Sequence, residues 1–291
     1  MKKQLHQVLN KCGFTLQKVD KSTDEQDYRE LYSEDSLQNR RFYNIGAGEF
    51  AHPFWTNVDN GNDFYTEING ISKHGISHDL FDHKPLPIED NSAEVVYTSH
   101  TMEHIDDASV SFLFRDAYRI LKKGGVIRVV VPNIELSYAA WQRGDRKYFF
   151  WADWPSINAN YEKFSLKIPF GQASLGQMFL DEFATSVCEI VNDGSKKRLS
   201  DQELQKIFNE MPFEEAVSYC ISLCSIENQK KYPFRHINGF TGNKLQKMLR
   251  ESGFQNVSKS GYLQSEVPVL RNSRFFDKTV PQASLFVEAK K

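Results

Sequence analysis

Short apolar runs recur along the first half of the chain and predict the strands of a sheet. Residues 42–45 and 55–59 form the first two runs, and 76–79 forms a short third. The runs at 95–98 and 126–131 are nearly continuous, which is typical of strands in a parallel sheet that is covered on both faces. We therefore expect these strands to form one sheet, in this order along the chain.

Helical periodicity connects these runs and continues beyond them. The apolar spacing predicts one helix at 103–121, before the fifth strand, and another at 241–252. Two closing strands are predicted at 257–261 and 284–289. Strands that alternate with helices predict an α/β fold built on a doubly wound sheet.

A helical, aromatic-rich segment interrupts this alternation. Its first third, 141–164, is crowded with Trp, Tyr and Phe, which could form a platform for a sugar or another ring, although most of them would form the core of an insertion or a contact between two copies of the chain. Tyr138 and Trp141 follow the fifth strand directly, so either could touch a substrate. The pattern thus predicts four parts: an N-terminal helix and linker (1–40), an α/β core (41–138), an inserted, mainly helical cap (139–233) and a C-terminal return to the core sheet (234–291).

A glycine-rich turn follows the first strand. Gly46 and Gly48 let the backbone take positive φ and approach a ligand closely. In an open α/β sheet this turn lies where nucleotide-like ligands bind. The turn also fits the G-x-G-x-x-A dinucleotide fingerprint. The stretch between Gly48 and the second strand is short for a full crossover helix, which disfavours an NAD(P)-dependent enzyme.

The order of motifs decides between the cofactors. The motifs are the glycine turn, Asp59 at the end of the second strand, Ser99–Ile105 after the fourth, and Lys122–Gly125, read as a helix C-cap. This order resembles class I S-adenosylmethionine (SAM) dependent methyltransferases. It is most similar to the branch with a shortened first helix, found among bacterial surface-glycan and secondary-metabolite genes. The resemblance implies a Rossmann-like doubly wound sheet and SAM as the cofactor.

The resemblance also implies which residues bind the cofactor. The glycine turn would contact the methionine moiety, Asp59 would accept both ribose hydroxyls, and Asp79 with Leu80 would bind the adenine. Aspartates at strand ends also form Asx turns, so a structural role stays open for both carboxylates. The full set is Asn44, Gly46, Ala47, Gly48, Asp59, Asp79, Leu80 and Ser99.

Three histidines are candidates for a catalytic base, in the order His104, His100 and His236. An imidazole with a pKa near 6.5 can take a hydroxyl proton at neutral pH. Residues 100–104 also spell H-x-x-E-H, a motif of inverted zinc peptidases, but that motif needs both histidines on one helix. Glu103 with His104 could hold a divalent metal, as in some quinone-type relatives, or Glu103 could cap a helix while His104 packs in the core. We assign no metal ligand from the sequence.

Composition restricts the possible binding partners and the cellular compartment. The 291 residues carry a net charge of −2, which gives no general attraction to nucleic acid. No apolar run approaches the ~20 residues that span a bilayer, and the N-terminus lacks the apolar region of a signal peptide. Four cysteines suggest a reducing compartment, so we expect a cytoplasmic protein. Cys220 and Cys224 are better explained as buried thiols than as half of a metal site.

The resemblance implies SAM-dependent methyl transfer to a small polar acceptor, with a hydroxyl of a sugar or glycan precursor as the expected one. The protein would align the acceptor oxygen with the methyl group in a dry pocket. An N-methyltransferase of a small molecule and a non-catalytic SAM- or nucleotide-binding protein remain open alternatives. A homodimer is a further expectation.

Overall fold

A computed structural model of the chain describes residues 21–60, 75–194 and 197–291. The helix expected at the N-terminus lies outside these ranges. The linker expected before the core contains two helices, α2 (Lys21–Leu31) and α3 (Glu34–Gln38). Among the residues that the structure describes, no helix is both long and apolar enough to cross a membrane.

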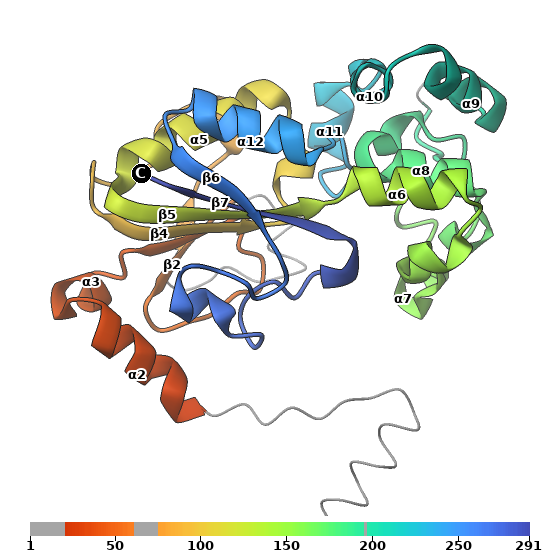
Figure 1. Cartoon of the computed structure of the whole chain (residues 1–291). Helices are drawn as coiled ribbons and strands as arrows, with labels where there is room; N and C mark the ends of the chain where they lie inside the picture. Colours follow the sequence, from red (N-terminus) through yellow and green to blue (C-terminus); the bar gives the residue numbers. More distant parts are fainter. Residues whose placement is uncertain (1–20, 61–74, 195–196) are drawn as a thin grey trace, which may run out of the picture.

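One seven-stranded sheet organises the fold, in the order β3-β2-β1-β4-β5-β7-β6. Neighbouring strands are parallel except for β7, which runs antiparallel to β5 and to β6. This mixed sheet confirms the predicted Rossmann-like, doubly wound fold (Figure 1). The strands are β1 (Phe42–Ile45), β2 (Trp55–Asp59), β3 (Gly75–Ser77), β4 (Ala93–Ser99), β5 (Leu121–Pro132), β6 (Gln255–Ser260) and β7 (Ser284–Lys290).

Two helices, α5 (Asp107–Ile120) and α12 (Gly242–Glu251), pack their apolar faces on one side of the sheet. The predicted start of α5 was four residues early, because Met102–His104 form a separate 3-10 turn, η2. The true cap is Asp106, whose carboxylate accepts the Ser109 N–H at 2.7 Å. The predicted glycine C-cap was also displaced, since α5 ends at Ile120 and the left-handed Gly124 lies within β5.

The other face of the sheet is covered by α2 and by the chain that joins β6 to β7. Tyr28 of α2 is fully buried and accepts a hydrogen bond from Trp55 Nε1. Arg128, the one charge in the apolar run of β5, is fully buried and bonds the Asp277 carboxylate at 2.6 Å and Glu288 at 2.9 Å. This ion network ties the long connection to the sheet.

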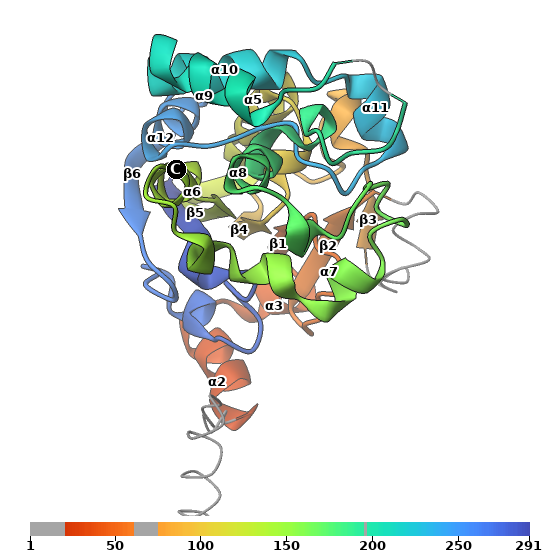
Figure 2. The same cartoon turned by 90° about the vertical axis from the view of Figure 1, so that its right-hand side faces the viewer.

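Further helices lie beyond the end of β5, at the carboxyl ends of the parallel strands (Figure 1 and Figure 2). All of them except the last, residues 226–231, contribute to a second hydrophobic core, in which Trp141 stacks on Phe179 with ring centroids 5.0 Å apart. Tyr138 packs in the same core, so neither of these aromatics lines the cavity described below. The helices are α6 (Ile134–Gln142), α7 (Pro155–Ala159), α8 (Leu175–Ala184), α9 (Asp201–Glu210), α10 (Phe213–Ser222) and α11 (Ile226–Lys231).

Short 3-10 turns complete the described chain. They are η1 (Leu80–Asp82), η2 (Met102–His104), η3 (Arg146–Asp153), η4 (Phe170–Gln172), η5 (Thr185–Val187), η6 (Pro268–Arg271) and η7 (Pro281–Ala283). Of these, η1 and η2 follow β3 and β4 at the carboxyl edge of the sheet, where ligands bind in open α/β folds.

Candidate active site

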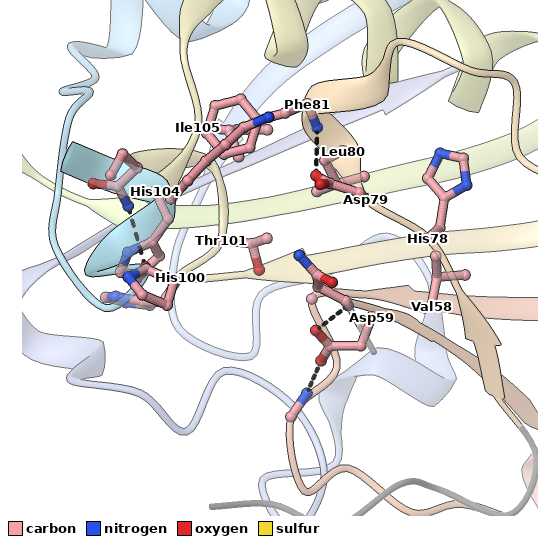
Figure 3. Close-up of a pocket in the computed structure, with 16 residues that line it drawn as sticks. Val58, Asp59, His78, Asp79, Leu80, Phe81, His100, Thr101, His104 and Ile105 are labelled. Atoms are coloured by element: carbon pink, nitrogen blue, oxygen red, sulfur yellow. Dashed lines mark hydrogen bonds between the residues drawn. The ribbon is translucent and has the colours of Figure 1, made fainter. Parts of the chain in front are cut away.

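A cavity of about 450 Å³ lies at the carboxyl ends of the parallel strands. Figure 3 shows Asp59 and Asp79 on one side of it and His100 and His104 on the other. Segments after four strands form most of the wall, and α11 closes it from the helices beyond β5. The lining residues are Gly46, Gly48, Val58, Asp59, Asn60, His78, Asp79, Leu80, Phe81, His100, Thr101, His104, Ile105, Gln229, Lys230 and Pro233.

Most of the residues predicted from sequence meet at this cavity. Those that line it are Gly46, Gly48, Asp59, Asp79, Leu80, His100 and His104. The other four, Asn44, Ala47, Ser99 and His236, do not contribute to the wall. Asn44 and Ala47 are buried in and just after β1, and Ser99 ends β4. His236 lies behind His104, with the two ring centroids 4.8 Å apart.

Asp59 joins the ends of β1 and β2. Its two carboxylate oxygens accept the backbone N–H groups of Gly48 and Asn60, each at 2.7 Å. These bonds hold the glycine turn against β2 and fix the carboxylate at the cavity wall. A carboxylate has about four lone-pair positions, so both oxygens can still accept hydrogen bonds from a ligand.

Asp79 caps the turn that follows β3. Its Oδ1 accepts the Phe81 N–H at 2.9 Å, which is the Asx-type role left open from sequence. This bond engages one oxygen and points the side chain along the cavity wall (Figure 3). The carboxylate therefore has a structural role and retains acceptor capacity for a ligand.

Close packing explains the first glycine of the turn. Gly46 has a φ of +69°, and a Cβ there would lie 2.0 Å from Thr101 Oγ1. Thr101 follows β4, and its hydroxyl donates to the Ile45 carbonyl at 3.3 Å. Gly46 is thus required both for its backbone conformation and for the contact between the loops after β1 and β4.

His100 is held on both ring nitrogens. Its Nδ1 lies 3.1 Å from Glu103 Oε1, and its Nε2 lies 2.9 Å from the Ser284 hydroxyl. Its backbone has a φ of +52°, which is uncommon for a residue other than glycine and is often found at functional sites. With both nitrogens engaged, His100 is less available than its neighbours to accept a proton.

His104 and His236 share one tautomer. Nδ1 of His104 lies 2.9 Å from the Arg235 carbonyl oxygen, and Nδ1 of His236 lies 3.0 Å from the Glu182 carbonyl oxygen. A carbonyl can only accept, so each Nδ1 carries the proton in the neutral ring. Nε2 of each ring therefore presents a lone pair.

Burial and charge set the ionisation of this cluster. Burial raises the pKa of the Glu103 carboxyl, but the adjacent His100, with His104 and His236, offsets this and lowers that pKa to about 2. Burial lowers the pKa of His236 to about 4, with His104 contributing in the same direction. At neutral pH, Glu103 is therefore a carboxylate and His236 a neutral imidazole.

The cavity-lining residues that come from α11 and the segment after it were not predicted from the sequence. Gln229 and Lys230 belong to α11, and Pro233 follows it. No sequence motif marks them, because their contact with the cavity depends on how α11 packs. Thr101 lies inside the recognised motif after β4, and its proximity to Gly46 is evident only in three dimensions.

Comparisons with known proteins identify the family of this chain. A family model described as a methyltransferase domain matches residues 4–259 of this chain. The chain therefore belongs to this family of methyltransferase domains, and it catalyses SAM-dependent methyl transfer. No curated protein matches it significantly.

Solved structures that are similar to this chain include methyltransferases from several organisms. One from Thermotoga maritima, described as a possible histamine N-methyltransferase, is 17% identical and has a TM-score of 0.39. The alignment covers 92% of this chain and 87% of that one. One from Archaeoglobus fulgidus is 13% identical, with coverages of 92% and 93% and a TM-score of 0.38. Human N-acetylserotonin methyltransferase in complex with SAM is 11% identical, with coverages of 88% and 51% and a TM-score of 0.35.

The cofactor of this chain is S-adenosylmethionine. The residues at the cavity fit such a group. The glycine turn allows close approach of a ligand, and Asp59 offers acceptors that suit a vicinal diol. Asp79 and Leu80 follow β3, the strand next to β2, and line the same cavity.

Proposed function

We propose that this enzyme methylates a hydroxyl oxygen of a small polar acceptor, a sugar or a glycan precursor. The observation that carries the proposal is the contact of His104 Nδ1 with the Arg235 carbonyl, which leaves Nε2 as the proton acceptor of the neutral ring, on a side chain that lines the cavity. A hydroxyl must lose its proton when it is methylated, and a positioned imidazole can accept it. The choice of a sugar comes from the family resemblance of the sequence, which is a weaker support.

The cofactor half of the site is proposed to be the eight residues identified from sequence. Gly46, Gly48 and Asp59 would hold the methionine and ribose parts, and Asp79 with Leu80 would hold the adenine. The remaining three, Asn44, Ala47 and Ser99, would support these groups from behind the wall. SAM supplies an electrophilic methyl group on its sulfonium.

The acceptor half would lie at the histidines. The acceptor oxygen bonds to the methyl carbon as the carbon–sulfur bond breaks, and the hydroxyl proton passes to Nε2 of His104. His100 is the second candidate for this role and His236 the third. The helices in residues 139–233 are proposed to act as a cap, because α11 already contributes Gln229 and Lys230 to the wall.

The test begins with the acceptor class. Purified protein and SAM are incubated with monosaccharides and nucleoside diphosphate sugars on one side and primary amines on the other, and S-adenosylhomocysteine is measured. We expect turnover with hydroxyl acceptors. Turnover confined to amines would replace the proposal with N-methylation.

The base is then tested on the best acceptor. We expect His104→Ala to lower kcat at least ~100-fold while cofactor affinity stays nearly unchanged, because a general base contributes that much to rate. His100→Ala and His236→Ala are compared in the same assay, with His83→Asn as a control outside the cluster. Near-normal turnover in all three cluster variants would exclude histidine base catalysis.

A further inference from the structure

A carboxylate and two imidazoles meet beside the cavity. One ligand atom from each of Glu103, His104 and His236 can be chosen so that all three lie within 4.8 Å of one another. Glu103 and His104 belong to η2, whereas His236 comes from the segment between α11 and α12. The fold therefore assembles this cluster from parts of the chain that are far apart in sequence.

The two rings are arranged as metal ligands usually are. Each donates its Nδ1 proton to a backbone carbonyl, His104 to Arg235 and His236 to Glu182. Such bonds fix the tautomer and orientation of metal-binding histidines and leave Nε2 as the ligand atom. The Arg235 carbonyl is itself fixed, since it also accepts Gln229 Nε2 at 2.7 Å.

Glu103 supplies the negative charge of the cluster. It is 0% exposed, His100 Nδ1 lies 3.1 Å from Oε1, and Oε2 has no hydrogen-bond donor among the described residues. Buried carboxylates are costly unless they are paired or coordinate a metal. A cation between Glu103 and the two Nε2 atoms would satisfy this group.

We propose that Glu103, His104 and His236 bind a divalent transition-metal ion of the Zn²⁺ class. Two imidazole nitrogens and one carboxylate oxygen suit Zn²⁺, Co²⁺ or Ni²⁺, whereas Mg²⁺ and Ca²⁺ prefer oxygen ligands alone. Ligand atoms around a tetrahedral ion at about 2.1 Å lie about 3.4 Å apart. The observed ligand atoms lie within 4.8 Å of one another, so binding an ion would draw the three side chains together.

Three protein ligands leave a coordination position open, as in catalytic metal sites. Because His104 lines the cavity, the ion would lie at its wall, within reach of an acceptor. There it binds the acceptor oxygen and lowers the pKa of the hydroxyl, with the proton released to water. This role rests on the proposed function, and in the loaded enzyme the two histidines serve as ligands while the ion takes over activation.

The first experiment measures binding to the whole chain. Protein stripped with EDTA and dialysed is titrated with Zn²⁺ and with Mg²⁺ by calorimetry, and with Co²⁺ by absorption spectroscopy. We expect about one Zn²⁺ or Co²⁺ per chain and no comparable affinity for Mg²⁺. In the Co²⁺-loaded wild type, NMR should show two shifted, exchangeable imidazole N–H signals, one from each Nδ1–H. Absence of stoichiometric binding, or of these two signals, overturns the proposal without any variant.

Variants then assign the ligands. We expect Glu103→Gln and His236→Gln each to weaken Zn²⁺ binding at least ~10-fold, since even outer-shell changes cost 10–100-fold in affinity. His83→Asn is the matched control, because His83 bonds Ser109 outside the cluster and its φ of +50° is one that Asn tolerates. Equal binding by all of these proteins would show an adventitious ion only. Methyl transfer that persists in the stripped protein would overturn the ion's role in activating the acceptor and leave the proposed function standing.

Discussion

Asp59 serves the fold and the ligand with the same two oxygens. Its bonds to the Gly48 and Asn60 N–H groups position the turn, and its carboxylate lines the cavity with acceptor capacity left for a ligand. The residue therefore gives a direct test of the cofactor site.

We expect Asp59→Ala to weaken binding of SAM and S-adenosylhomocysteine by ~1.5–3 kcal/mol, or roughly 10- to 150-fold, because hydrogen bonds to a charged group have that value. Calorimetry on the purified protein measures the change. Glu215→Gln, at an exposed glutamate of α10, is the control for loss of a carboxylate. Equal affinity of Asp59→Ala and wild type would remove Asp59 from the site.

At this scale the sequence predicts residues better than it predicts their partners. Gly46 and Asp59 could be identified because their spacing along the chain is short and specific to the motif. The pairing of His104 with His236 could not, since it depends on a carbonyl at Arg235 and another at Glu182, on separate segments. Hydrogen-bond partners of this kind are fixed by tertiary packing and leave no local pattern.

At the scale of elements, the loops after β1 and β4 are locked together at Gly46. We expect Gly46→Ala to destabilise the protein by about 2–5 kcal/mol, from left-handed strain of about 1–2 kcal/mol plus overpacking of about 1–3 kcal/mol against Thr101. Gly144→Ala is a matched control, because Gly144 has nearly the same φ, +68°, and nothing within 4 Å of its Cβ position.

Urea unfolding of the two variants separates these terms. Gly144→Ala should show the strain alone, and Gly46→Ala with Thr101→Gly should recover part of the loss. If Gly46→Ala and Gly144→Ala are equally destabilised, the contact with Thr101 contributes nothing.

The connection from β6 to β7 is held by a buried ion network. Asp277 accepts from Arg128 and also from the Leu263 N–H at 3.0 Å. We expect Asp277→Asn to cost about 3 kcal/mol in the free energy of unfolding, because it leaves a buried guanidinium undercompensated. Glu251→Gln, in the exposed pair with Lys247, should change stability by less than about 1 kcal/mol. Comparable small effects for both variants, measured by urea unfolding, would contradict a structural role for this network.

Six of the seven described strands begin and end within two residues of their predicted bounds, whereas β5 begins five residues before its predicted run and α5 begins four residues after its predicted start. The strands β1, β2, β4 and β5 could be predicted from their apolar runs, because strands of a sheet that is covered on both faces need apolar side chains on both sides. Helix α5 begins at Asp107 instead of 103, because Met102–His104 form a separate 3-10 turn, in which His104 lies at the cavity wall. The buried ion pairs of Arg128 could not be predicted either, since its partners Asp277 and Glu288 lie far along the chain.

In the whole molecule, one cavity joins the sheet to the helices beyond it. The sheet contributes the turn at Gly46 and the carboxylate of Asp59, and α11 contributes Gln229 and Lys230. The composition of residues 139–233 predicted helices with a separate hydrophobic core. It did not predict that α11 would line the cavity that also contains Asp59. Shared lining implies that a ligand should stabilise both parts together.

Hydrogen exchange can measure this coupling. We expect saturating S-adenosylhomocysteine to slow amide exchange at residues 45–60, at η1 and in α11, because a ligand that binds only the folded state suppresses local opening where it makes contact. Helix α9 has no residue at the cavity, so its exchange should be unchanged and serves as the internal control. Protection at 45–60 and η1 without any change in α11 would show that the cofactor contacts the sheet alone, and the helices beyond β5 would then have no part in holding it.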